Sequence, residues 1–193
     1  MATDTITAKE PRAERQDARR NRELVLHAAA KAFATDANPT LESIAKSAGV
    51  GIGTLYRNFA TREELVEAVY RTELERLCLS VDGLLEATPP DVALRSWMVS
   101  YSDFVMTKHG MADALRAVIA TGAVTSAQTR AALTAAIQTM LDAGAADDTL
   151  RADVRAEDVS ASLAGIFIVA GSPDNREQAL RMLDLLVDGV RAH

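Results

Sequence analysis

The chain has 193 residues and a mass of 20.6 kDa, which fits one domain or two small domains that share a core. Apolar residues make up 48% and charged residues 25% of the sequence, which excludes disordered, collagen-like and low-complexity chains. We expect no membrane-spanning segment, because the apolar stretches are short, and no secretory signal, because residues 1–22 are polar. Cys78 is the single cysteine, so no intramolecular disulfide can form, and we expect a cytoplasmic protein.

Charge is distributed unevenly, although the formal net charge of −6 by itself argues against a nucleic-acid-binding protein. Residues 1–59 carry nine basic and seven acidic side chains, whereas residues 79–193 carry nine basic and fifteen acidic ones. Five arginines fall within the stretch 12–22. We expect residues 1–18 to form a flexible basic arm, and the arginines just after it to contact phosphates.

Helices are expected throughout, because the sequence holds 36 alanines against ten glycines and five prolines and shows no alternating strand pattern. We therefore predict an all-α fold. Apolar residues recur at helical spacing, and glycines and prolines separate the helices. The expected helices, about nine in number, cover residues 22–35, 41–48, 52–59, 62–86, 92–108, 112–121, 126–143, 156–170 and 175–192.

The second and third helices carry the most informative pattern. A helix over 41–48, capped by Thr40, precedes a turn at Gly49 and a second short helix over 52–59. This is the length of a helix-turn-helix motif, in which apolar residues lock the second helix onto the first. The outer face of the second helix is then free to enter a major groove of DNA.

Three segments, 41–45, 48–59 and 61–65, resemble the DNA-binding domain of TetR-type (TetR/AcrR) helix-turn-helix transcriptional repressors. The resemblance is strongest in the Gly-Thr-Leu-Tyr-x-x-Phe run over 53–59. It implies a double-stranded DNA operator as the partner. Gly51 departs from the family pattern, which commonly has serine or threonine at the start of the recognition helix.

The resemblance also implies two domains: a three-helix DNA-binding domain over 19–64, and an effector-binding and dimerisation domain over 65–193, linked by the helix over 62–86. The side chains expected at phosphates are Arg20, Arg22, Thr40, Tyr56, Asn58 and Arg62. Those expected at the groove are Gly51, Ile52, Thr54 and Arg57, with Arg57 the best candidate to read a guanine. Two alternatives stay open: Tyr56 packs without touching DNA, or Arg57 contacts a phosphate and not a base.

A stripe of large side chains follows one face of the expected helix over 92–108. Trp97, Tyr101, Phe104 and Lys108 are spaced at i, i+4, i+7 and i+11. The stripe is either a packed core or part of an adaptable apolar cavity. Since the resemblance implies an inducer in this part of the fold, we expect a small apolar or aromatic effector to contact Trp97, Met98, Tyr101, Phe104, Met111, Leu115, Met140 and Phe167.

The last two expected helices are apolar nearly all round. A helix with no polar face must be buried on every side, which in a body of this size requires a second copy of the chain. We expect a homodimer whose four-helix interface includes Leu163, Phe167, Leu183, Leu186, Val187 and Val190.

These patterns fit a ligand-responsive dimeric transcriptional regulator, most simply a repressor that leaves a pseudo-palindromic operator when an effector binds. An effector-independent DNA-binding regulator or an activator is the first alternative. A helical enzyme is the second, although the sequence has only three histidines and no His-Glu-x-x-His or Ser-His-Asp arrangement. We expect no catalytic residue, no metal, no cofactor and no membrane partner.

Overall fold

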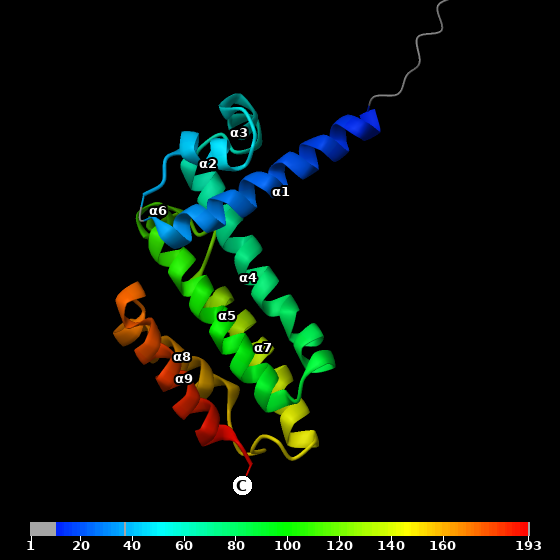
Figure 1. Cartoon of the computed structure of the whole chain (residues 1–193), viewed down its shortest axis with the longest axis vertical. Coiled ribbons are helices and arrows are strands. Elements are labelled where there is room, and N and C mark those ends of the chain that lie inside the picture. The colour runs from blue at the N-terminus through cyan, green and yellow to red at the C-terminus, as the bar shows by residue number, and fades with distance from the viewer. Residues whose placement is uncertain (1–10, 37, 193) are drawn as a thin grey trace, which may run out of the picture.

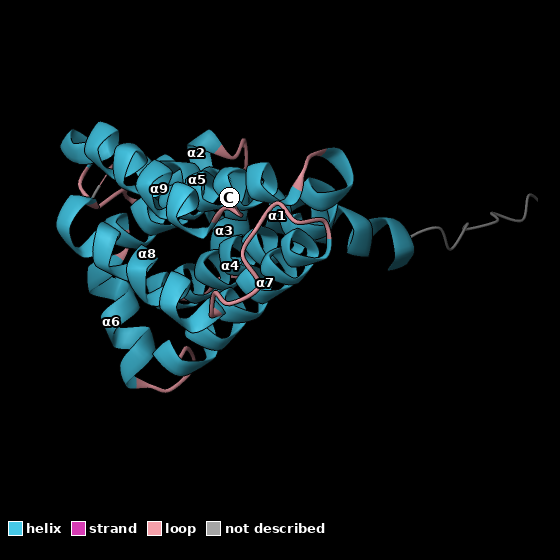
Figure 2. Ribbon diagram, turned by 90° about the horizontal axis from the view of Figure 1, so that it is seen from below, coloured by secondary structure: helices cyan, strands magenta, loops and turns pink. Residues whose placement is uncertain are grey.

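The computed structural model describes residues 11–36 and 38–192, and within these ranges the regular elements are helices (Figure 1, Figure 2). The all-α expectation is confirmed. Among the described residues we find no helix with the length and apolarity needed to cross a bilayer. The elements are α1 (Pro11–Thr35), α2 (Leu41–Ser47), α3 (Ile52–Asn58), α4 (Arg62–Ala87), α5 (Pro90–Gly110), α6 (Ala112–Ala120), α7 (Ser126–Ala146), α8 (Ala156–Ala170), the short 3₁₀ helix η1 (Pro173–Asn175) and α9 (Arg176–Val190).

Helix α1 begins at Pro11, well before the expected start at residue 22. Residues 11–18, which belong to the arm expected over residues 1–18, are helical; residues 1–10 lie outside the described part of the chain. Helix propensity explains the difference, because proline suits a first helical turn and the next residues are mostly arginine, alanine, glutamate and glutamine. In Figure 1 the N-terminal half of α1 extends away from the other helices.

Helix α4 belongs to both ends of the molecule. Thr61 caps it, since the threonine hydroxyl accepts a hydrogen bond from the Glu64 amide at 3.1 Å. Buried apolar residues follow the helix from Leu65 near its start to Val81 near its end. It packs against α1, α5, α6 and α7, and in Figure 1 it runs from the α2–α3 pair down the side of α5. One continuous helix thus joins the helix-turn-helix to the body.

Trp97 fixes α5 to α4 in the centre of the body. The side chain is fully buried, and its indole Nε1 donates a hydrogen bond to the Leu77 carbonyl of α4 at 2.9 Å. Its ring also stacks on Tyr101, with 6.1 Å between the ring centroids and 20° between the planes. Because the one polar atom of the indole is satisfied, the whole ring contributes apolar burial to the core.

Helix α5 ends directly against the backbone of α1. A Cβ atom at Gly110 would lie 1.7 Å from the carbonyl oxygen of Phe33 and 3.0 Å from that of Asp36. Only glycine lets the ends of the two helices approach this closely. Gly110 therefore fixes how α1 sits on the body.

Gly110→Ala should destabilise the fold by about 1 to 3 kcal/mol, because the added methyl group must push α1 and α5 apart. The matched control is Gly83→Ala in α4, where the space around a Cβ atom is open. The control should stabilise the fold by about 0.5 to 1 kcal/mol, since alanine is the better helix former. Urea unfolding followed by circular dichroism measures both changes. A neutral Gly110→Ala would show that the two helix ends are not tightly packed.

Candidate nucleic-acid interface

The turn between α2 and α3 has the geometry expected of a helix-turn-helix. The Thr40 hydroxyl caps α2 by accepting a hydrogen bond from the Ser43 amide at 3.1 Å. After α2 the chain takes the left-handed conformation at Gly49, whose φ is +70°, and the Val50 amide donates to the Ala45 carbonyl at 3.0 Å. Because residues with a side chain rarely adopt this φ, the glycine sets the angle at which α3 leaves α2.

Helix α3 buries one face and exposes the other. Leu55 and Phe59 are buried and hold α3 in the common core of α1 and α2. On the opposite face Ile52 is 38% exposed and Tyr56 is 47% exposed. Large apolar and aromatic side chains left in water on one short helix indicate a surface that meets a partner.

The beginning of α3 is open. Gly51 contributes no side-chain cap, but its carbonyl accepts a hydrogen bond from the Thr54 amide at 2.9 Å. Apart from the adjacent residues and the backbone of α3 itself, no heavy atom of the described residues lies within 4 Å of where a Cβ atom would stand at Gly51 or Gly53. The absence of a serine or threonine at position 51 therefore does not change the start of α3 at Ile52, and it leaves no side chain at the N-cap.

Arg57 lies exposed along its own helix. Its Nη2 donates to the Thr54 hydroxyl at 3.0 Å and its Nε donates to the Gly53 carbonyl at 3.3 Å. Hydrogen bonds that are open to water contribute little net free energy, because water replaces them readily. The guanidinium can thus leave these partners and reach another molecule.

Two other arginines from the expected phosphate set are tied to their own chain. The Nη1 atom of Arg22 donates to the Asn58 carbonyl at 3.1 Å, and its guanidinium lies 4.3 Å from the centre of the Phe59 ring. Arg62 donates from Nη1 to the Pro39 carbonyl at 2.7 Å and from Nη2 to Asn38 Oδ1 at 2.8 Å. These contacts connect α1 to the end of α3, and α4 to the loop before α2.

The remaining expected residues also divide into those bonded to their own chain and those that are exposed. Asn58 is half-buried, and its amide nitrogen donates to the Thr54 carbonyl at 2.8 Å. Arg20, Thr40 and Tyr56 are exposed. Sequence reasoning missed Lys46, which is exposed in the last turn of α2 next to the turn into α3. A single lysine in a short helix carries no pattern, so only its position in space identifies it.

A cavity of about 780 Å³, here called the α7–α8 cavity, lies in the body. Small residues on α8 leave the space open, since Ala161, Ala164 and Gly165 line one wall. The other walls come from α4, α5, α6 and α7, including Tyr70, Tyr101, Lys108, Ile119, Thr129 and Arg130.

Two neutral phenols line this cavity, together with the charged side chains of Lys108, Arg130, Glu157 and Asp158. The Tyr70 hydroxyl shares a hydrogen bond of 2.8 Å with the Thr129 hydroxyl, and burial raises the pKa of Tyr70 more than this bond lowers it. Burial also raises the pKa of Tyr101, and the neighbouring Tyr70 adds to that rise. No hydrogen bond to the Tyr101 hydroxyl is found in the described part of the chain. The cavity thus offers an uncharged Tyr101 hydroxyl, two tyrosine rings and charged groups of both signs.

Most residues expected to line an effector pocket are packed in the core of the chain. Five of them are at most 2% exposed and do not line the α7–α8 cavity: Trp97, Met98, Met111, Leu115 and Met140. Tyr101 does line it, Phe104 packs against the rings of Tyr70 and Tyr101, and Phe167 lines a second cavity near α1. These large side chains pack against one another in the core of the body, in the place where a pocket was expected.

The residues expected at a dimer interface face the inside of their own chain. Leu163, Phe167, Leu183, Val187 and Val190 are buried within the single chain, and Leu186 is half-buried. The apolar side chains that α8 and α9 leave in water are Ile168 (84% exposed), Val169 (66%) and Leu185 (73%). Helix α9 is amphipathic, with Arg181, Asp184 and Asp188 exposed. Because α8 has apolar residues on both of its sides, the sequence does not show which side faces the core.

Comparison with known families matches both parts of the chain. Residues 25–69 match the family model described as bacterial regulatory proteins, tetR family. Residues 89–192 match the model described as transcriptional regulator SbtR-like, C-terminal domain. The comparison with curated proteins gave no match.

Solved structures give the same picture. The chain is similar to the TetR transcriptional regulator SCO0520 from Streptomyces coelicolor, with 48% identity and a TM-score of 0.82 over 89% of this chain and 98% of that one. The TetR transcription regulatory protein from Mycobacterium vanbaalenii shares 30% identity and a TM-score of 0.71, over 92% and 99% of the two chains. A transcriptional regulator from Cytophaga hutchinsonii, at 19% identity and a TM-score of 0.66 over 88% and 98%, shares the fold alone.

The two kinds of arginine should separate in a stability measurement. Arg62→Ala should lower the free energy of unfolding by about 1.5 kcal/mol or more, because it removes two hydrogen bonds from a charged donor. Arg57→Ala, the matched control, should change it by no more than about 0.5 kcal/mol, since its partners are exposed. Urea unfolding measures both. Equal losses in the two variants would contradict a bracing role for Arg62.

Proposed function

The chain belongs to the TetR family of bacterial transcriptional regulators, which are not enzymes, and we propose that it acts as a homodimeric repressor on a pseudo-palindromic DNA operator. The observation that carries the proposal is the exposed face of α3, with Ile52, Tyr56 and Arg57 in water. A helix presented in this way fits the major groove of B-form DNA. The regulator acts in the bacterial cytoplasm, where its operator lies.

Arg57 provides the sequence recognition in this proposal. Once its guanidinium leaves Thr54, it can donate two parallel hydrogen bonds to the edge of a guanine. Ile52 adds apolar contact at the groove, where thymine presents a methyl group. Exposed groups around α3 bind the phosphates on either side: Arg20, Thr40, Lys46 and Tyr56.

The outer faces of α8 and α9 support the dimer. Ile168, Val169 and Leu185 are large, apolar and mostly exposed in the single chain. Both helices lie on the side of α5 away from α4 in Figure 1 and Figure 2, so a second copy can approach them. Pairing the same faces about a two-fold axis buries these side chains and places two copies of α3 on one DNA.

An effector in the α7–α8 cavity is the means of release in this proposal. The cavity touches α4 at Tyr70, in the half of the helix that begins at the helix-turn-helix. A ligand that displaces Tyr70 therefore changes the tilt of α4 and the spacing of the two recognition helices. The two tyrosine rings favour an apolar or aromatic ligand, and the neutral Tyr101 hydroxyl and the charged side chains of the lining offer it hydrogen-bonding partners. Coupling of about 1 to 3 kcal/mol is sufficient for a switch.

Selection from random double-stranded DNA with the full chain should enrich a pseudo-palindrome, with half-sites separated by about one helical turn or a modest multiple. Arg57→Ala should cost roughly 1 to 3 kcal/mol on the selected site and relax the preference at one base pair per half-site. Tyr56→Phe should weaken binding to selected and random DNA alike, because it removes a phosphate contact. Equal affinity of the unaltered chain for selected and random DNA at physiological salt would contradict the proposal.

Leu185→Glu combined with Val169→Glu should convert the dimer into a monomer, because the interface would bury unpaired carboxylates. Analytical ultracentrifugation at low micromolar concentration measures the mass. The control is Leu79→Glu, which places the same charge on a leucine of α4 that is 69% exposed, close to the 73% of Leu185. The control should stay dimeric. A double variant that stays dimeric would place the interface elsewhere on the surface.

A further inference from the structure

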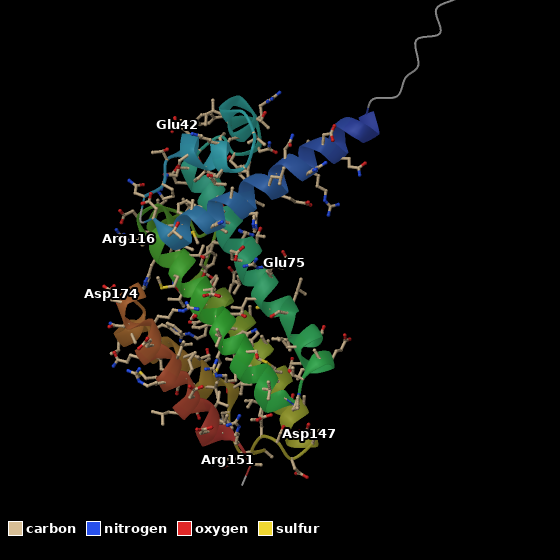
Figure 3. All side chains as sticks on the ribbon, in the orientation of Figure 1. Glu42, Glu75, Arg116, Asp147, Arg151 and Asp174 are labelled. Atoms are coloured by element: carbon tan, nitrogen blue, oxygen red, sulfur yellow. The ribbon has the colours of Figure 1, made fainter. Side chains whose placement is uncertain are left out.

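A second cavity, here called the α1–α5 cavity, lies between the helix-turn-helix domain and the body. Its volume is about 380 Å³, within the range of small-molecule sites, and it shares no lining residue with the α7–α8 cavity. Helix α1 forms one wall with Ala30, Lys31 and Ala34. Helices α4, α5, α8 and α9 and the turn from α8 to α9 form the others, and Figure 3 shows this turn, labelled at Asp174, beside the end of α1.

The floor of the α1–α5 cavity is apolar. Phe167, Ala170 and Ala179 are buried in it. Two buried hydroxyls also line it, but each is satisfied by its own helix: Ser102 donates to the Val99 carbonyl at 2.7 Å, and Thr107 donates to the Asp103 carbonyl at 3.0 Å. The floor therefore suits a hydrocarbon chain or ring and makes no demand for a polar group.

The rim is charged, with one positive charge in excess. Arg76 is paired with Glu73, and Arg176 is paired with Asp103, with 3.2 Å between Nη1 and Oδ1. Lys31 lies on the same rim and forms no ion pair within the described part of the chain. His27, one helical turn before Lys31, is the remaining titratable group of the lining. A monoanion can thus meet Lys31 without breaking either ion pair, whereas a dianion would lack a second unpaired cation.

We propose that the α1–α5 cavity binds a small amphiphilic carboxylate, with its hydrocarbon part on the floor and its carboxylate at Lys31. The ligand touches α1 on one side and α5 and α9 on the other, so it braces the DNA-binding domain against the body. This site is separate from the effector cavity proposed above, and binding to it does not require the chain to recognise DNA.

The test uses octanoate and the neutral octan-1-ol as probes, titrated calorimetrically into the full chain. Lys31→Gln should weaken octanoate binding roughly tenfold and leave octan-1-ol binding unchanged, because only the carboxylate uses the ammonium group. Lys108→Gln is the matched control, since this exposed lysine lines the other cavity, and it should leave octanoate binding unchanged. Ala34→Phe, which fills the α1–α5 cavity from the exposed edge of α1, should abolish octanoate binding.

Hydrogen exchange gives the second readout. Octanoate should slow exchange of the backbone amides in the second half of α1, because the ligand holds this segment on the body. Several results would overturn the proposal: no octanoate binding at millimolar concentration, binding that Ala34→Phe leaves intact, or a loss caused by Lys108→Gln and not by Lys31→Gln. The last result would assign the carboxylate to the α7–α8 cavity.

Discussion

The contact between Gly110 and the last turn of α1 controls the geometry of the DNA-facing end. With no side chain between the two backbones, α1 cannot tilt on the body without opening a tightly packed joint. Helix α1 in turn holds α3 through Arg22, which reaches the Asn58 carbonyl and the Phe59 ring. Helix α4 is the second link between the domains. Two links fix an orientation where a single one would allow a hinge.

The α7–α8 cavity lies against one of these links, and the α1–α5 cavity lies against both, since Glu73 and Arg76 of α4 also line it. The α7–α8 cavity touches α4 at Tyr70, and the α1–α5 cavity touches α1 at Lys31 and Ala34. A ligand in either place therefore acts on the orientation of α3 from a distance, through packed helices and without touching the DNA-binding surface. The charges follow the same division: Arg22 and Arg62 hold the domain together, while Arg57 makes only bonds that water can replace.

The local features of the fold could be predicted because they depend on neighbouring residues. The caps at Thr40 and Thr61 and the left-handed turn at Gly49 are such features, and α8 covers the expected residues 156–170. The cavities and the outer face of α8 could not be predicted, because they depend on which of several apolar helix surfaces pack against one another in the fold. The spacing of Trp97 in the sequence fits both a core and a pocket position, and in the structure the side chain is fully buried and donates a hydrogen bond to the Leu77 carbonyl. The helix over 11–18 was not predicted either, because these residues have high helix propensity but no apolar face that would mark a helix in the sequence.

The most direct test of the rigid joint is the distance between the two helix-turn-helix domains of the dimer. With Cys78 replaced by serine, a spin label is attached at Glu42→Cys on the exposed surface of α2. Pulsed electron paramagnetic resonance then measures the distance between the two labels of the dimer. The account predicts one narrow distance distribution, which becomes broad when Gly110→Ala is added and stays narrow with Gly83→Ala. A distribution that is already broad without a substitution at Gly110, or one that Gly110→Ala leaves unchanged, would contradict the claim that this contact is rigid.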